Sequence, residues 1–312
     1  MSKEYVIMAD STCDLSKDLR EEYGITVLAG HVNAPDGREY DVMPDWDENF
    51  TQESFYSALK KNPAGFQTAP PSVYESAQAM EEAVKAGKDI IMMTISGTMS
   101  GCYNFAQSGA NIVLEKYPDA KIVMVDSLRF GPGFGLMCCC AGALQQEGKS
   151  LEEVVEWLEE NKGRFHQAGW LDDLSFVAKK GRLTHAKAFF GTLAGVKPLG
   201  EFDYNGMTTV IGKASGAKAA YAALLTYIEK TIENAEEQVI FIAQTDRMKQ
   251  AVIFKQMIEE RFHPRDVRIM DVHVSCGVNV GPGLMAAYYI GKPISKDLAE
   301  EKAIIEAALN QK

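Results

Sequence analysis

The segment with the most evident chemistry is Ser96–Gly101 (SGTMSG), a run of small hydroxyl residues and glycines. It follows an expected strand and precedes an expected amphipathic helix from Asn104 to about Lys116. Such a turn leaves amides and hydroxyls open at a helix N-terminus, which favours a bound carboxylate or phosphate. We take Ser96, Ser100 and Gly101 as candidate ligand-binding residues. The alternative is a loop whose serines only cap the helix. The spacing matches neither a Walker loop nor GxGxxG, so it does not indicate a nucleotide.

Two Asp-Ser pairs follow other expected strands. Asp10 and Ser11 come after the first strand, and Asp126 and Ser127 after a later one. The carboxyl ends of parallel strands meet at one edge of an open α/β sheet, where ligands bind. We therefore expect both pairs to face the same site as the glycine-rich loop. Asp-Ser is also a common capping pair, so each pair alone is a weak signal.

Thr68 lies in the segment Phe66–Ser72 (FQTAPPS). Pro70 and Pro71 hold this chain extended, and Ser72 is placed to cap the next helix. We expect Thr68 beside that helix start, pointing into a cleft. A plain turn before a helix is the simpler alternative.

Two segments in the second half add candidate ligand contacts. Lys179–Arg182 (KKGR) precedes a helix expected to begin near Thr184, and Arg182 could hold a carboxylate or phosphate through its fork of donors. The alternative is a solvated basic turn. Gly277–Gly283 (GVNVGPG) contains Asn279, and its glycines would let the backbone approach a ligand closely. The alternative is a tight turn.

Composition excludes several classes of function. The 312 residues carry 32 basic and 43 acidic side chains, a net charge of −11, so nucleic acid is not an expected partner. No stretch reaches the roughly 18 apolar residues of a membrane span, so no integral membrane association is expected. Six cysteines without a CxxC pair, and an N-terminus without a secretion signal, predict a cytoplasmic protein. No metal is expected, because five histidines lack ligand spacing: His31, His166, His185, His263 and His273.

The elements that position these residues follow a βαβ pattern in the first half. Nearly continuous apolar runs predict strands buried on both faces, at Tyr5–Met8, Ile25–Leu28, Asp89–Ile95 and Lys121–Val125. Capping boxes that begin at Ser72 and Ser150 predict helices between or after them. Alternating strands and helices give a parallel sheet with helices on both faces.

The second half differs. Asn205-Gly206 between two apolar runs predicts a hairpin of Val196–Leu199 with Thr208–Ile211. Further strands at 238–243 and 267–274 alternate with helices at about 216–234 and 247–262. The fold class is therefore two α/β domains: residues 1–162 with the parallel sheet, and residues 163–312 with a mixed sheet and packed helices.

Taken in order, these motifs resemble the DegV family, the bacterial fatty-acid-binding proteins, from residue 4 to about residue 291. The motifs that carry the resemblance are Asp10-Ser11, TxxPS at Thr68, the SGxSG-type loop ending at Ser100-Gly101, Asp126-Ser127, KGR at Arg182, Lys197-Pro198 and GxNxGPG around Asn279. The resemblance implies a long-chain fatty acid as ligand, no cofactor and no activity as an enzyme. It implies an acyl tunnel to which the C-terminal domain contributes. Thr68 and Ser100 match the family's carboxylate-holding residues.

Some family members present the fatty acid to a separate ATP-dependent fatty acid kinase, which makes an acyl phosphate for phospholipid synthesis. Arg182 matches the arginine linked to that step. Asn279 stands where the family usually has His, and Asn can carry neither a proton nor a positive charge at neutral pH. Lys180 replaces a usual glycine, and Lys213–Gly216 (KASG) departs from the usual K-x-R-G. The carrier interpretation survives these departures, whereas the kinase step is left in doubt.

Two other functions stay open. The family's first-domain fold resembles that of dihydroxyacetone-type kinases, so a small-molecule phosphotransferase is conceivable. A binding protein for a short carboxylate would use the same head-group residues with a shorter pocket.

Overall fold

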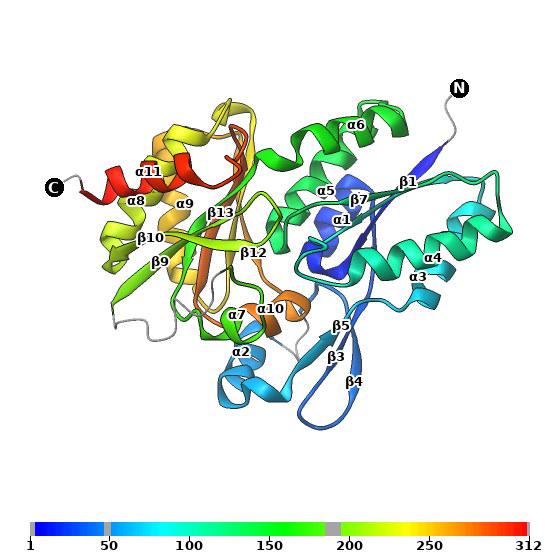
Figure 1. Ribbon diagram of the computed structural model, residues 1–312, viewed down its shortest axis with the longest axis horizontal. Coiled ribbons are helices and arrows are strands. Elements are labelled where there is room, and N and C mark those ends of the chain that lie inside the picture. The colour runs from blue at the N-terminus through cyan, green and yellow to red at the C-terminus, as the bar shows by residue number, and fades with distance from the viewer. Residues whose placement is uncertain (1–3, 47–50, 185–194, 311–312) are drawn as a thin grey trace.

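A four-stranded parallel sheet forms the N-terminal half of the computed structural model, which describes residues 4–46, 51–184 and 195–310 (Figure 1). Its strand order is β2-β1-β6-β7. The strands are β1 (Tyr5–Asp10), β2 (Ile25–Leu28), β6 (Asp89–Thr94) and β7 (Ile122–Asp126). All four lie within two residues of the bounds expected from the apolar runs. Every residue of β6 is buried, as a strand covered on both faces requires.

Helices cover both faces of this sheet. They are α1 (Lys17–Tyr23), α3 (Val73–Lys85), α4 (Cys102–Lys116), α5 (Gly131–Gln146) and α6 (Leu151–Asn161). Met80 of α3 and Ala110 of α4 pack in one cluster with Met92 of β6. Phe134 of α5 packs in the other cluster, which contains Met93 on the opposite face of β6. The capping boxes predicted at the starts of α3 and α6 are both present.

A six-stranded mixed sheet forms the C-terminal half, in the order β10-β9-β8-β13-β11-β12. Its elements are β8 (Phe165–Leu171), β9 (Val196–Phe202), β10 (Thr208–Ser215), α8 (Gly216–Thr231), β11 (Val239–Gln244), α9 (Met248–Phe262), β12 (Asp266–Asp271), β13 (Leu284–Ile290) and α11 (Ala299–Asn310). The hairpin β9–β10 is confirmed, and Gly206 has the positive φ of 80° that its turn needs. The central strands β8 and β13 were not predicted.

Helix α5 is packed between the two sheets. It contacts the 3-10 helix η1 (Ser11–Cys13) on one side and strands β8, β11 and β13 on the other. Glycines permit this close approach. A Cβ at Gly133 would lie 2.6 Å from the ring of Tyr288, and a Cβ at Gly135 would lie 2.3 Å from the carbonyl oxygen of Cys13. Helix α5 therefore fixes η1 of the first half against β13 of the second.

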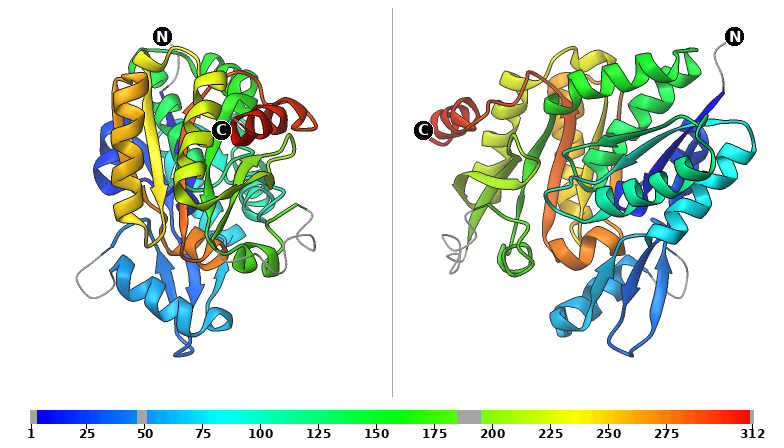
Figure 2. Two further views of the ribbon diagram at one scale, coloured as in Figure 1. Left: turned by 90° about the vertical axis from the view of Figure 1, so that its left-hand side faces the viewer. Right: turned by 45° about the vertical axis from the view of Figure 1, so that its right-hand side comes forward.

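A small antiparallel sheet, not predicted from the sequence, lies below the other two in both views of Figure 2. Its order is β4-β3-β5, with β3 (Gly30–Asn33), β4 (Glu39–Val42) and β5 (Gln67–Ala69), and α2 (Gln52–Lys61) packs near it. The strands are only three or four residues long, so no periodicity identifies them. This sheet carries Thr68.

The tight turn weighed as an alternative for the glycine-rich segment does not hold over most of that segment. The segment Gly277–Gly283 is largely the helix α10 (Val274–Val280), and positive φ values occur only at its end, 75° at Gly281 and 107° at Gly283. Gly277 is needed inside α10 because a Cβ there would lie 2.7 Å from the hydroxyl of Tyr56 on α2. A short helix, α7 (Ser175–Lys179), precedes the KKGR turn. The helix predicted from Thr184, and with it His185, lies on residues 185–194, outside the described residues.

No helix within the described ranges is long and apolar enough to cross a membrane. The described ranges also contain the short 3-10 turns η2 (Pro63–Gly65), η3 (Lys162–Arg164) and η5 (Ala235–Glu237). The expected domain boundary after residue 162 falls at η3, between α6 and β8.

His31 links the small sheet to the parallel sheet's helix α3. Its Nε2 lies 2.9 Å from a carboxylate oxygen of Glu75, and its Nδ1 lies 3.0 Å from one of Asp41. Burial lowers the pKa of His31, whereas the hydrogen bond with Glu75 and the charges of Glu75 and Asp41 raise it. The raising effects together outweigh burial, so the pKa is above its ordinary value. The pKa of Glu75 falls to about 2 because Ser72 and His31 stabilise its carboxylate.

We expect His31→Gln to lower the free energy of unfolding more at about pH 5 than at about pH 8. Because the folded-state pKa of His31 is raised, its contribution is fully present below the unfolded pKa of about 6.5 and is lost as pH rises through the folded pKa. Urea unfolding at both pH values measures the difference. An equal loss at both would contradict the ion-pair role.

Gly135→Ala should lower the free energy of unfolding by about 1–3 kcal/mol, the usual cost of overpacking a core. The new methyl group would lie 2.3 Å from the carbonyl oxygen of Cys13, so α5 or η1 must shift. Urea unfolding checks this. Gly163→Ala is the matched control, since no heavy atom lies within 4 Å of its Cβ position. Equal stabilities of the two variants would show that α5 does not need this close contact.

Candidate functional site

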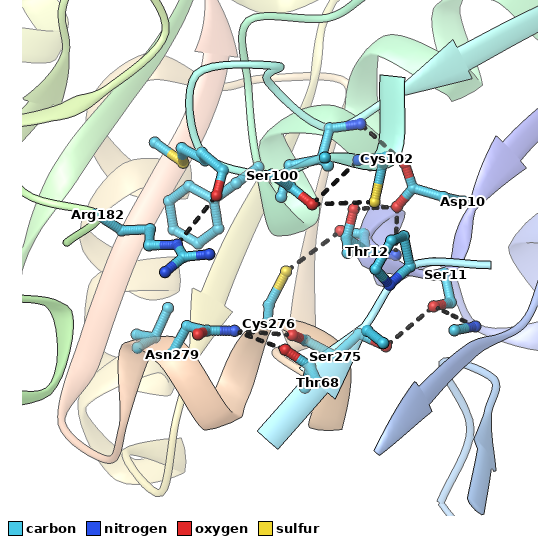
Figure 3. Close-up of a pocket in the computed structure, with 18 of the residues that line it drawn as sticks. Asp10, Ser11, Thr12, Thr68, Ser100, Cys102, Arg182, Ser275, Cys276 and Asn279 are labelled. Carbon is cyan, nitrogen blue, oxygen red and sulfur yellow. Dashed lines mark hydrogen bonds between the residues drawn. The ribbon is translucent and has the colours of Figure 1, made fainter. Parts of the chain in front are cut away.

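A cavity of about 160 Å³ lies at the carboxyl edge of the parallel sheet, beyond the ends of β1 and β6 (Figure 3). Its wall combines η1, β5, the β6–α4 loop, the turn after α7 and helix α10. Segments distant in the sequence therefore converge on one space, as the strand-edge argument predicts. The predicted residues that line it are Asp10, Ser11, Thr68, Ser100, Gly101, Arg182 and Asn279.

Ser100 stands directly before the first turn of α4. Its hydroxyl oxygen accepts a hydrogen bond from the backbone N–H of Cys102 at 3.3 Å, and the hydroxyl donates to the Cys102 sulfur at 3.1 Å. Sulfur is a weak acceptor, so this proton can turn to a better one at little cost. The half-buried Ser100 is thus a neutral donor at a helix N-terminus, which suits an anionic oxygen.

Thr68 and Asn279 lie next to one another in the wall of the cavity (Figure 3). The Nδ2 of Asn279 donates to the Thr68 hydroxyl oxygen at 3.2 Å and to the carbonyl oxygen of Ser275 at 3.3 Å. The second bond joins residues one turn apart on α10. Because the Thr68 oxygen already accepts a proton, its own proton is free to be donated to a ligand.

Arg182 connects the turn after α7 to the β6–α4 loop. Its Nε donates to the carbonyl oxygen of Met99 at 3.0 Å, and its Nη1 donates to the carbonyl oxygen of Lys180. The ammonium group of Lys180 bonds the carbonyl oxygen of Phe66, just before β5. Within the described part of the chain no carboxylate pairs with Arg182, so it is a half-buried cation without a counter-ion.

Asp10 and Ser11 line the cavity but bond neighbouring segments. Asp10 is 1% exposed and accepts from the backbone N–H of Thr12 at 3.0 Å and of Ile95 at 2.9 Å. Burial raises the pKa of Asp10, and these hydrogen bonds oppose the rise. The Ser11 oxygen accepts from the N–H of Gly30 at 3.0 Å and lies 2.9 Å from the hydroxyl of Ser275. Both side chains hold the walls of the cavity in place.

Three predicted residues do not line the cavity: Ser96, Asp126 and Ser127. Asp126 accepts hydrogen bonds from the backbone N–H groups of Gly97 at 3.2 Å and Leu128 at 2.9 Å. It therefore stabilises the β6–α4 loop without lining the cavity. Ser127 bonds the backbone of Arg129. Ser96 is fully buried and faces Gly206 of the β9–β10 turn, whose Cβ position is 2.5 Å from the Ser96 oxygen. The shared sheet edge was predicted, but not the direction in which each side chain turns.

Several lining residues were not predicted. They include Thr12, Cys102, Phe130, Ser275 and Cys276. Burial raises the pKa of both thiols well above the ordinary value, so both are neutral. Ser275 lies four residues before Asn279 on α10, so identifying this segment as a helix would have placed the two on one face.

A second cavity of about 30 Å³ adjoins the first. The two share Phe130, Val177, Thr208 and Val280 in their walls. The second reaches the mixed sheet, where its further wall is mainly apolar: Trp170, Leu171, Leu174, Leu183, Pro198, Val210 and Leu284. The space therefore changes from polar at Ser100 and Thr68 to apolar beneath β8 and β9.

Among residues 4–46, 51–184 and 195–310, no group of three or more His, Cys, Asp or Glu side chains is placed to hold a metal ion. The donors at the cavity are hydroxyls, an amide and a guanidinium. That set binds an anion by hydrogen bonds and charge.

The family model for the uncharacterised proteins of the DegV family matches residues 4–292. A DegV domain-containing protein from Clostridium perfringens is 32% identical over 289 residues, which are 93% of this chain and 98% of that protein. The match thus spans both sheets and every segment that lines the cavity.

Solved structures share the fold. A DegV family protein from Thermus thermophilus, described for its fatty acid binding, has a TM-score of 0.82 and 26% identity, covering 92% of this chain and 99% of that one. The fatty acid kinase B3 protein of Streptococcus pneumoniae, loaded with linoleic acid, has a TM-score of 0.76 over 92% of this chain and 99% of that one. At 23% identity the second likeness is one of fold alone. The predicted fold class of two α/β domains is confirmed.

Proposed function

The chain belongs to the DegV family, and on this premise we propose that it is a carrier that binds a long-chain fatty acid. The observation that carries the proposal is the change in the cavity from hydroxyl donors and an arginine with no carboxylate partner among the described residues to an apolar wall. The relative from Thermus thermophilus, 26% identical, is described as binding a fatty acid. The fatty acid is the proposed ligand, with no cofactor and no reaction catalysed by this chain.

We place the carboxylate between Ser100 and Thr68. Among the described residues, the Ser100 hydroxyl donates only to a sulfur and the Thr68 hydroxyl donates to no acceptor, so an ionised carboxylate can take both protons. Hydrogen bonds to a charged acceptor are about twice as strong as neutral ones. Arg182 adds a positive charge beside Met99, next to Ser100 in the chain. Asp10 and Ser11 hold the neighbouring loops in place by hydrogen bonds, and Asn279 orients the Thr68 hydroxyl by its hydrogen bond to that oxygen.

We place the hydrocarbon chain along the path from the first cavity to the second. Burial of each methylene contributes about 0.8 kcal/mol, so the chain supplies most of the affinity. The two cavities are smaller than the roughly 300–1,000 Å³ of typical ligand pockets. A long chain therefore enters by moving apart the side chains at the junction, where Phe130 and Val177 border both cavities.

Presentation of the acid to a separate fatty acid kinase is the finer part of the proposal. Arg182 supports it, because a cation at the head group can also hold a transferred phosphoryl group. Asn279 limits it, because this amide cannot supply a proton or a charge. We therefore propose that the bound fatty acid accepts the phosphoryl group slowly, and that the side chain at position 279 governs the rate of this transfer.

Two further assignments stay proposals. We propose the cytoplasm as the compartment, since all six cysteines are free. We propose residue 162 as the end of the first domain, since the turn η3 separates α6 of the parallel sheet from β8 of the mixed sheet.

The protein purified from a bacterial host should carry a fatty acid at a one-to-one ratio. Native mass spectrometry detects the complex, and organic extraction followed by mass spectrometry gives the chain length. A folded protein without lipid that binds only short acids would favour the short-carboxylate alternative instead.

Ser100→Ala and Thr68→Val should each weaken fatty acid binding roughly tenfold to a hundredfold, the loss of one hydrogen bond to a charged group. Competition with a fluorescent fatty acid measures the affinities. Ser108→Ala is the matched control, since the Ser108 hydroxyl bonds its own helix at Asn104. If both variants bind as tightly as the unchanged protein, the head group lies elsewhere.

With a bacterial fatty acid kinase and ATP, the loaded protein should yield acyl phosphate, trapped as a hydroxamate, and Asn279→His should raise the rate. The imidazole would add the proton that an amide cannot supply. Without the kinase no ATP should be consumed. No acyl phosphate from either protein would reject the kinase step, whereas ATP consumption by this chain alone would favour a phosphotransferase.

A further inference from the structure

Gln167 places an amide in the wall of the second, apolar cavity. It lies on the central strand β8 and is 3% exposed. Its backbone N–H donates to a carboxylate oxygen of Glu201 at 2.7 Å, and Glu201 also bonds His166 and the hydroxyl of Tyr227. The strand that carries the amide is therefore held rigidly, and the amide keeps its place in the wall.

Of the two polar atoms of the Gln167 side-chain amide, only the oxygen has a hydrogen-bond partner among the described residues. The hydroxyl of Tyr288 donates to the Gln167 Oε1 at 3.0 Å. Burial holds the pKa of Tyr288 well above its ordinary value, so the phenol stays protonated and needs this acceptor. The Nε2 of Gln167 then points the other way and has no hydrogen-bond partner among the described residues. It lies beside Gly200, whose Cβ position is 3.5 Å away.

The wall of the second cavity holds one side-chain hydroxyl, that of Thr208, and no hydrogen bond joins it to this N–H group in the described part of the chain. The other side chains in this wall are aromatic or aliphatic, such as Phe130, Trp170 and Leu284. A plain hydrocarbon chain in the cavity would leave a buried donor unpaired, which is unfavourable. An oxygen on the chain would pair with it. A space of about 30 Å³ is enough for a group the size of one water molecule.

We propose that the preferred ligand is a fatty acid with an oxygen substituent, a hydroxyl or keto group, part-way along its hydrocarbon chain. The oxygen accepts a hydrogen bond from the Nε2 of Gln167. The Oε1 stays with Tyr288, so ligand binding leaves no polar atom of this pair without a partner. This inference rests on the proposed function and adds the class of acid to it.

The test is a competition observed by native mass spectrometry. The lipid-free protein is mixed with equal amounts of octadecanoic acid and of one hydroxy- or oxo-octadecanoic acid, over a panel with the oxygen at successive carbons. The ratio of the two complexes gives the affinity ratio. We expect one position in the panel to be preferred roughly three- to tenfold, the effect of one neutral hydrogen bond. Comparing hydroxyl with keto at that position identifies the substituent.

Two variants separate specificity from folding. Gln167→Met keeps the size of the side chain and removes the amide, but leaves the Tyr288 hydroxyl unpaired. The double variant Gln167→Met with Tyr288→Phe removes both groups, so no polar atom of the pair is left buried. Both should bind octadecanoic acid and lose the preference. Gln256→Met, at an exposed position of α9, should keep it.

The outcomes are distinct. Equal binding of substituted and plain acids by the unchanged protein would overturn the inference and leave fatty acid binding intact. A preference that persists in the double variant would also overturn it, because another group would then be the donor. If the unchanged protein binds no acid of the panel, the proposed function fails and this inference fails with it.

Discussion

The position of helix α5 between the two sheets is the constraint on which the site depends. Gly135 brings the helix against Cys13 at the end of η1, and Gly133 brings it against Tyr288 of β13. η1 carries Asp10 at its N-cap and Ser11 in its first turn, so the polar wall of the cavity is set against the mixed sheet by this helix. Larger side chains would separate the sheets and open the cavity. Close packing on both sides of one helix thus determines the geometry of the site.

Hydrogen bonds between loops then close the remaining walls. Arg182 bonds Met99, Ser11 meets Ser275, and Asn279 bonds Thr68. Each bond joins segments that are far apart in the sequence, and all three join one half of the fold to the other. The same groups that suit a ligand therefore also hold the walls together. A ligand carboxylate that takes the free protons of Ser100 and Thr68 can bind without breaking these links.

The sequence predicts the regular elements and the shared edge better than the site itself. Continuous apolar runs and the capping box at Ser72 identify elements because local chemistry decides them. The strand that carries Thr68 has only three residues and is formed by pairing with β3, which no local pattern records. Gly277 is compatible with a turn, yet it lies inside α10, where its missing Cβ lets the helix pack closely against Tyr56. Asp126 and Ser96 are at the predicted edge, but the loop turns their side chains away from the cavity, and only tertiary contacts decide that.

Affinity and selectivity come from different ends of the proposed binding path. Burial of methylenes gives affinity to any sufficiently long chain, so it distinguishes acids poorly. Polar groups distinguish them, because a buried donor without a partner is unfavourable. At the head-group end the donors are neutral hydroxyls and an arginine. No histidine is among the described residues that line this cavity, and position 279 holds an asparagine. Recognition of the carboxylate thus needs no side chain that changes charge near neutral pH. Gln167, the buried amide among the described residues of the apolar wall, is the group that can tell one long acid from another.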